Sequence, residues 1–173
     1  ATVEVTKHEL PLEPIVLFPS LGGYGAQFNH HLYAPITQPW MPPGSYVDVE
    51  EKVKELQPQL VRIFYNDNWE ENIDGTHPEW RDNYASFVKV VQLAQATGET
   101  IDVNYQVVAN ITSGKRTPEV AMHAFANALE DLVTNYHLTN VQWATVANEP
   151  NSTALSLDQL IALNRALHNE LVA

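Results

Sequence analysis

Hydrophobic residues gather in four short runs along the chain, and each run is followed by a stretch with apolar residues at helical spacing. The runs predict strands over 22–28, 60–66, 101–107 and 141–147, because short apolar segments bounded by turn residues are typical of buried strands. The last three runs begin at about 40-residue intervals. This alternation predicts an α/β fold with a parallel sheet, because parallel strands need helical crossovers between them.

The four helical stretches carry start and stop signals. Ser45 is expected to cap the first helix, and Gly98 to end the second. Thr117, followed by a proline, marks the start of the third helix, and Ser156 opens a capping box at the start of the fourth. Their apolar faces are expected to cover the sheet: Val49, Val53 and Leu56; Phe87, Val88 and Val91; Met122, Phe125, Leu129, Leu132, Val133 and Tyr136; Leu157, Leu160, Ile161, Leu167 and Leu171.

A polar pair, Asn148 and Glu149, follows the fourth predicted strand and precedes Pro150. Pro150 cannot extend a hydrogen-bonded ladder, because it has no N–H. Strict strand alternation would send the amide and the carboxyl to opposite faces. Both reach one ligand only if the strand bulges there or has already ended. A polar turn without function is the alternative interpretation of the same residues.

Two further features favour a binding site at the carboxyl ends of the strands. Trp40 and Trp69 lie in long connections that follow strands, where parallel α/β folds build their sites. Their indole faces suit the apolar face of a sugar ring, although they could instead pin the loops down. Arg62 interrupts the apolar second strand, and a buried guanidinium needs acceptors. It forms either a structural ion pair or a support for a catalytic carboxylate.

The segment Asn148-Glu149-Pro150 at the end of a fourth strand, with Arg62 on the second, resembles the glycoside hydrolases of clan A. These are (β/α)8 TIM-barrel enzymes that cleave glycosidic bonds with retention. The resemblance covers residues 22–173 and implies that the chain holds the first four βα units of such a barrel. It implies that Glu149 is the general acid/base, that Asn148 binds the sugar 2-hydroxyl and that Arg62 lies beside the nucleophile. Trp40, Trp69 and Tyr105 are the further candidates for contact with an oligo- or polysaccharide, and no cofactor is implied. Asn104 and Gln106, on either side of Tyr105, are candidates for lining a subsite.

The departure from the family is that its nucleophile is a glutamate on a seventh strand, whereas four strands are predicted here. Retaining hydrolysis needs two carboxyl groups about 5 Å apart. The chain alone is therefore expected to be inactive, and to associate with itself or with a missing C-terminal half. Partial burial near Trp143 is expected to keep Glu149 protonated before it donates to the glycosidic oxygen.

Composition narrows the class of ligand. Nine basic and 21 acidic residues give a net charge of −12, which disfavours nucleic acid, anionic membranes and acidic polysaccharides and leaves neutral glycans. The chain has no cysteine and no run of 18 apolar residues, so neither disulfides nor a membrane span is expected. We expect a secreted or extracytoplasmic protein, in which 1–21 forms an extended lead-in to one unit over 22–173.

Several other patterns bear on competing interpretations. His30 and His31 are adjacent but lack a convergent third ligand, so no metal is expected. The glycines over 22–25 are not followed by the residues of a phosphate-binding loop. One alternative is a non-catalytic carbohydrate-binding or interaction module. A second is a flavodoxin-like, doubly wound domain, whose strand order would reverse after one strand, whereas a barrel arc runs in sequence order.

Overall fold

A computed structural model of the protein describes residues 25–42, 44–66, 81–106 and 108–173. Strands and helices alternate along the chain as predicted. The elements are β1 (Gly25–Phe28), the 3₁₀ helix η1 (Gln38–Trp40), α1 (Ser45–Leu56), β2 (Leu60–Tyr65), α3 (Arg81–Ala96), β3 (Thr100–Tyr105), α4 (Ala109–Thr112), α5 (Pro118–Thr134), β4 (Val141–Thr145) and α6 (Leu157–Leu171). The predicted lead-in over 1–21 and the site candidate Trp69 lie outside these ranges.

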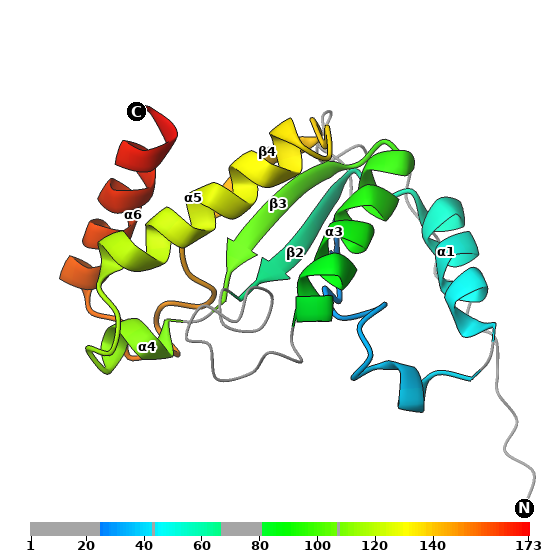
Figure 1. Cartoon of the computed structure of the whole chain (residues 1–173), viewed down its shortest axis with the longest axis horizontal. Coiled ribbons are helices and arrows are strands. Elements are labelled where there is room, and N and C mark those ends of the chain that lie inside the picture. The colour runs from blue at the N-terminus through cyan, green and yellow to red at the C-terminus, as the bar shows by residue number, and fades with distance from the viewer. Residues whose placement is uncertain (1–24, 43, 67–80, 107) are drawn as a thin grey trace, which may run out of the picture.

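The four strands form one parallel sheet in the order β1-β2-β3-β4. Each consecutive pair of strands is therefore joined by a crossover that contains a helix, as Figure 1 shows. The order does not reverse within the described sheet, so the flavodoxin-like alternative is wrong. A sheet that adds its strands in sequence order is compatible with part of a βα repeat.

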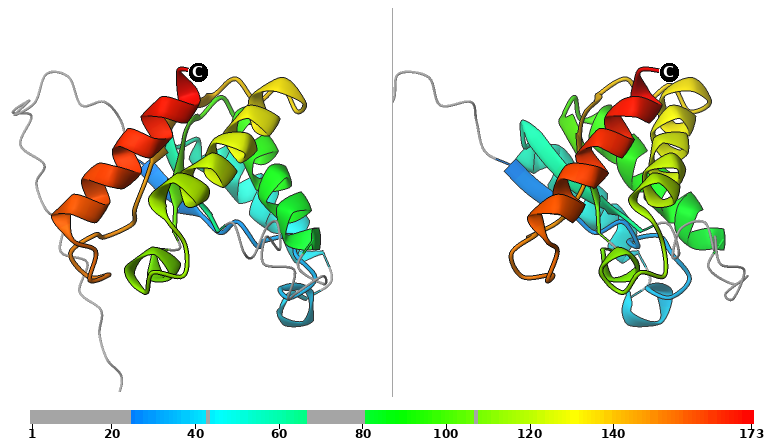
Figure 2. Two further views of the ribbon diagram at one scale, coloured as in Figure 1. Left: turned by 60° about the vertical axis from the view of Figure 1, so that its left-hand side comes forward. Right: turned by 90° about the vertical axis from the view of Figure 1, so that its left-hand side faces the viewer.

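One face of the sheet is covered by helices. On β2 the residues Val61, Ile63 and Tyr65 are fully buried, and Tyr65 stacks on Phe125 of α5 with ring centroids 5.4 Å apart. On β3 the alternate residues Ile101, Val103 and Tyr105 belong to the same core. Figure 2 shows α3 and α5 together on this side of the sheet. Burial of these large apolar side chains, each contributing roughly 1.5–3 kcal/mol, makes this layer the core of the molecule.

The opposite face, called the inner face here, is predominantly polar. The strand register places on it Gln27, Arg62, Phe64, Asp102, Asn104 and Thr145, while Trp143 lies beside an irregularity in the β3–β4 pairing. Val103 does not belong to this face, because it has the same phase as Ile101 and packs under the helices. The inner face therefore has the composition of a surface that binds polar ligands.

The helix ends follow the predicted signals with one exception. The Thr117 hydroxyl accepts a hydrogen bond from the Val120 N–H, and Ser156 forms both bonds of its capping box. Gly98 follows α3 with a φ of +81°, a conformation that glycine adopts without strain. The exception is Ser45, because Gly44 occupies the N-cap position of α1 and the Ser45 hydroxyl donates to the Pro42 carbonyl instead.

Part of the predicted apolar helix surface remains exposed around α6. This helix packs chiefly against α5 and leaves a hollow of about 730 Å³ beside β4. Val133, Trp143 and Leu171 line this hollow. The following residues, all expected in the core, are exposed instead: Leu56, Val133, Tyr136, Leu157, Ile161 and Leu171. No helix in the described ranges combines the length and apolar composition needed to cross a bilayer.

Candidate functional site

The Asn148–Glu149 pair lies just beyond the end of β4, which stops at Thr145. Strand alternation therefore no longer governs the two side chains, which meets the condition stated above for a shared ligand. Glu149 has a φ of +44°, and its carbonyl accepts a 2.8 Å hydrogen bond from the Ser152 N–H. The Ser152 hydroxyl also lies 3.3 Å from the Glu149 Oε2. This turn presents the Glu149 carboxyl on the surface.

Arg62 of β2 contacts both the neighbouring strand β1 and the segment that follows β4. Its guanidinium donates to the side-chain oxygen of Gln27 on β1, and its Nη1 donates to the Asn148 Oδ1 at 3.4 Å beyond β4. The guanidinium also lies over the Phe64 ring, 5.1 Å from its centroid. Because Asn148 accepts through Oδ1, its Nδ2 is the group that can donate to a substrate hydroxyl. The sequence-predicted residues Arg62 and Asn148 are thus brought together across 86 residues of chain.

Asp102 is the acidic neighbour of Arg62 on this face. The Thr145 hydroxyl lies 3.0 and 3.1 Å from its two carboxyl oxygens. Burial raises the pKa of the Asp102 carboxyl, while the Thr145 hydrogen bond and the positive charge of Arg62 lower it. When it is ionised, the Asp102 carboxylate balances the positive charge of Arg62 on the inner face. Sequence reasoning missed Asp102, Gln27 and Thr145, although the alternation of Asp102 and Asn104 with Ile101 and Val103 was the available signal.

A pocket of about 540 Å³, called the carboxyl-end pocket here, opens where the strands end. Asn66 and Gln106 follow β2 and β3 directly, and Thr153 lies in the turn after Glu149. The remaining lining residues are His30, His31, Val108, Ala109 and Thr112. In Figure 1 the arrowheads of β2 and β3 point toward α4 and the segment that follows β1. The pocket therefore occupies the end of the sheet at which parallel α/β folds bind ligands.

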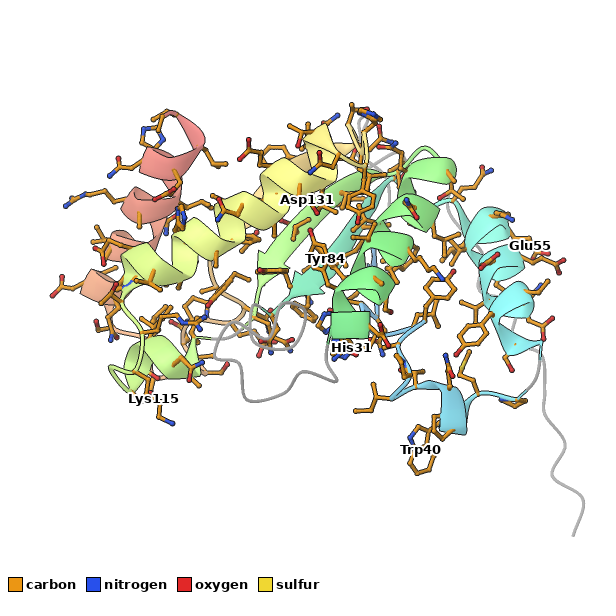
Figure 3. The ribbon with its side chains drawn as sticks, in the orientation of Figure 1. His31, Trp40, Glu55, Tyr84, Lys115 and Asp131 are labelled. Carbon is orange, nitrogen blue, oxygen red and sulfur yellow. The ribbon has the colours of Figure 1, made fainter. Side chains whose placement is uncertain are left out.

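The segment after β1 that carries His30 and His31 is tied to the helix layer. The Ser86 hydroxyl of α3 donates to the His30 carbonyl and accepts from the Tyr33 N–H, both at 2.9 Å. The two imidazole rings stack with centroids 3.8 Å apart, and His30 meets the Phe64 ring edge-on. These contacts fix the histidines at the pocket wall. Figure 3 shows His31 at this end of the molecule.

The other sequence-predicted site residues are placed differently. Trp40 is 84 % exposed on η1 and points away from the ribbon, so it does not pin its loop and its face is open to a ligand (Figure 3). Tyr105 is fully buried against Tyr65 and Phe125, so its expected contact with substrate is wrong. Trp143 is 61 % exposed and Glu149 is exposed, so the burial expected around Glu149 is absent from the described structure.

Within the described ranges, no group of three or more histidine, aspartate or glutamate side chains is arranged to hold a metal ion. No family model matches the sequence, and no curated protein matches it either. The function therefore has to be inferred from the site itself.

Proposed function

We propose that this chain carries the acid/base half of a retaining glycoside hydrolase of the clan A type, built on the first four βα units of a (β/α)8 barrel. The observation that supports this most is the hydrogen bond from Arg62 on β2 to Asn148, which directly precedes Glu149 at the carboxyl end of β4. Two distant sequence motifs meet there at the ligand-binding end of a sheet in sequence order. Chance proximity of two structural residues explains this arrangement less well.

In this mechanism Glu149 donates a proton to the glycosidic oxygen as the bond to the sugar breaks. A second carboxylate, outside the described residues, attacks the anomeric carbon and forms a glycosyl-enzyme. Glu149 then takes a proton from the water that releases the sugar. Asn148 donates its Nδ2–H to the 2-hydroxyl, and Arg62 holds the Asn148 amide in place. The substrate is a neutral oligo- or polysaccharide, because the chain has a net charge of −12.

The test is the substitution Glu149→Ala in a catalytically complete form of the enzyme, assayed on two aryl glycosides. The substrate with a poor leaving group should be cleaved about 10² to 10⁴-fold more slowly, since general acid catalysis contributes that much. The substrate with a good leaving group needs little protonation, so formation of the glycosyl-enzyme should change much less. Glu51→Ala, on the exposed surface of α1, serves as the matched control. Equal effects on the two substrates would contradict an acid role for Glu149.

A non-catalytic carbohydrate-binding module is the second candidate. The exposure of Trp40 favours it, because an open indole on the surface can stack on a sugar without any chemistry. Sugar affinity that is unchanged by Glu149→Gln, together with no hydrolysis by any longer form, would support this function instead. A secreted or extracytoplasmic location is part of both proposals.

A further inference from the structure

The carboxyl-end pocket is chemically distinct from the cluster around Arg62. Its described lining contains amides, hydroxyls and imidazoles, and neither a carboxylate nor a lysine or arginine. Asn66 and Gln106 continue the inner-face phase of Phe64 and Asn104 on β2 and β3, and the Gln106 N–H donates to the Tyr65 carbonyl at 2.9 Å. The two amides therefore stand side by side at the end of the sheet.

The carboxyl-end pocket also has an apolar wall. The ring of His31, which stacks on the buried His30, and the side chain of Ala109 supply flat and apolar surface. A ligand that presents both hydroxyl groups and C–H faces matches this lining, because amides can donate and accept at once. The volume of about 540 Å³ lies within the range of small-molecule sites. The lining and the volume of the pocket therefore match one or two uncharged sugar rings.

We propose that the carboxyl-end pocket is a binding subsite for a neutral glycan, in which Gln106 and Asn66 hydrogen-bond the ring hydroxyls. The proposal rests on the proposed function and names the part of the sheet that holds the sugar next to the scissile bond. Thr153 places the pocket four residues from Glu149, within one turn of the chain. The bound ring lies over the ends of β2 and β3, and the glycan chain continues toward Glu149.

The lining disfavours other ligand classes. An anion would require cationic side chains or a row of backbone N–H groups, and the described lining residues include no lysine or arginine. A metal ion would require a third ligand for the two histidines, and the described residues contain no such group. An uncharged polyol remains as the class that the pocket satisfies.

Binding is tested on the 173-residue chain with cellohexaose, xylohexaose and mannohexaose, with an oligogalacturonate as the acidic comparison. The imidazole NMR signals of His30 and His31 report occupancy of the pocket. At least one neutral hexasaccharide should shift these signals, and Gln106→Ala should weaken its binding roughly three- to tenfold, the effect of one lost neutral hydrogen bond. Gln92→Ala, an exposed position on α3, is the matched control and should bind as the parent chain does.

The outcomes separate this inference from the proposed function. Because Gln106 is exposed, its truncation should leave thermal unfolding unchanged, so a loss of affinity reports on the pocket. Binding unaffected by Gln106→Ala, stronger binding of the oligogalacturonate, or no binding of any neutral hexasaccharide would each overturn the subsite. None of these results bears on the leaving-group test of Glu149. Conversely, Glu149→Ala could affect both aryl glycosides equally while Gln106→Ala weakens glycan binding. The pocket would then be the binding site of a non-catalytic carbohydrate-binding module.

Discussion

Glu99 is the residue whose ionisation should most affect stability. It precedes β3, its side chain is 1 % exposed, and neither carboxyl oxygen has a hydrogen-bond partner among the described residues. Burial raises the pKa of Glu99 from 4.5 to about 7. The neighbouring Thr97 lowers this pKa somewhat, but its hydroxyl is directed to the Leu93 and Ala94 carbonyls. An unpaired buried carboxylate is costly, so the folded chain retains the proton up to about pH 7.

The folded-state pKa of Glu99 lies above the unfolded value, so the folded state binds the proton more tightly. The free energy of unfolding should therefore fall as pH rises from about 4.5 to about 7, and then level off. Glu99→Gln should remove this slope and stabilise the chain at pH 8 by roughly 1–3 kcal/mol, the upper limit being set by the shift. Urea unfolding at several pH values measures it, with exposed Glu119→Gln as control. An unchanged slope in Glu99→Gln would show that Glu99 does not titrate in this range.

Individual site residues could be predicted from the sequence where the motif itself carried the chemistry. Asn148 and Arg62 could be selected as site candidates, because each is a polar residue at a position where a strand should be apolar or should end, but the hydrogen bond between them was not predicted. Tyr105 was misplaced because its aromatic character was given more weight than its strand phase, which it shares with Ile101. Gln106, also a candidate for lining a subsite, has the other strand phase and lines the carboxyl-end pocket. The packing of His30 against Phe64 has no signal in the sequence at all.

At the scale of elements, the N-terminal cap of α6 should make a measurable contribution to stability. The Ser156 hydroxyl accepts from the Gln159 N–H at 3.1 Å, and the Gln159 side chain accepts from the Ser156 N–H at 3.0 Å. Ser156→Ala should therefore lower the free energy of unfolding by about 1 kcal/mol. Ser45→Ala is the contrast, because Gly44 caps α1, and its effect should be smaller. The shift of the urea midpoint measures both, and equal shifts would contradict the difference in capping.

Element positions were predictable because local signals and the tertiary fold agree over most of the chain. All four predicted strands are present, and their ends differ from the prediction by at most two residues, apart from the part of β1 outside the described ranges. The exposed residues of α6 were not predictable, since periodicity shows that Leu157 and Ile161 form an apolar face but not what covers it. That depends on neighbouring elements, which a pattern along one helix does not specify.

At the scale of the whole molecule, the sheet has two lateral edges with no strand partner among the described residues, one on β1 and one on β4. Parallel sheets occur almost always with both faces covered. Here the helices cover one face, and the hollow of about 730 Å³ separates β4 from α6. Gln142, Trp143 and Ala144 of β4 are exposed, and all three line this hollow. Free strand edges of this kind pair readily with another chain.

We therefore propose that the chain self-associates, or pairs with another polypeptide, through a parallel strand added beside β4. A second copy could close an eight-stranded ring, because its β1 runs parallel to β4 and the order of strands continues without reversal. The net charge of −12 on each copy opposes this association, so added salt should strengthen it. Light scattering should give an average mass above the 19.4 kDa of the monomer, and this mass should be higher at 1 M salt than at 0.05 M salt.

Two variants test whether β4 is the interface. Trp143→Lys should shift the equilibrium toward monomer, whereas Trp40→Lys, on η1 and outside β4, should not. A monodisperse, cooperatively unfolding monomer at high micromolar concentration in both salts would contradict this association, because the edges of β1 and β4 would then need no partner strand.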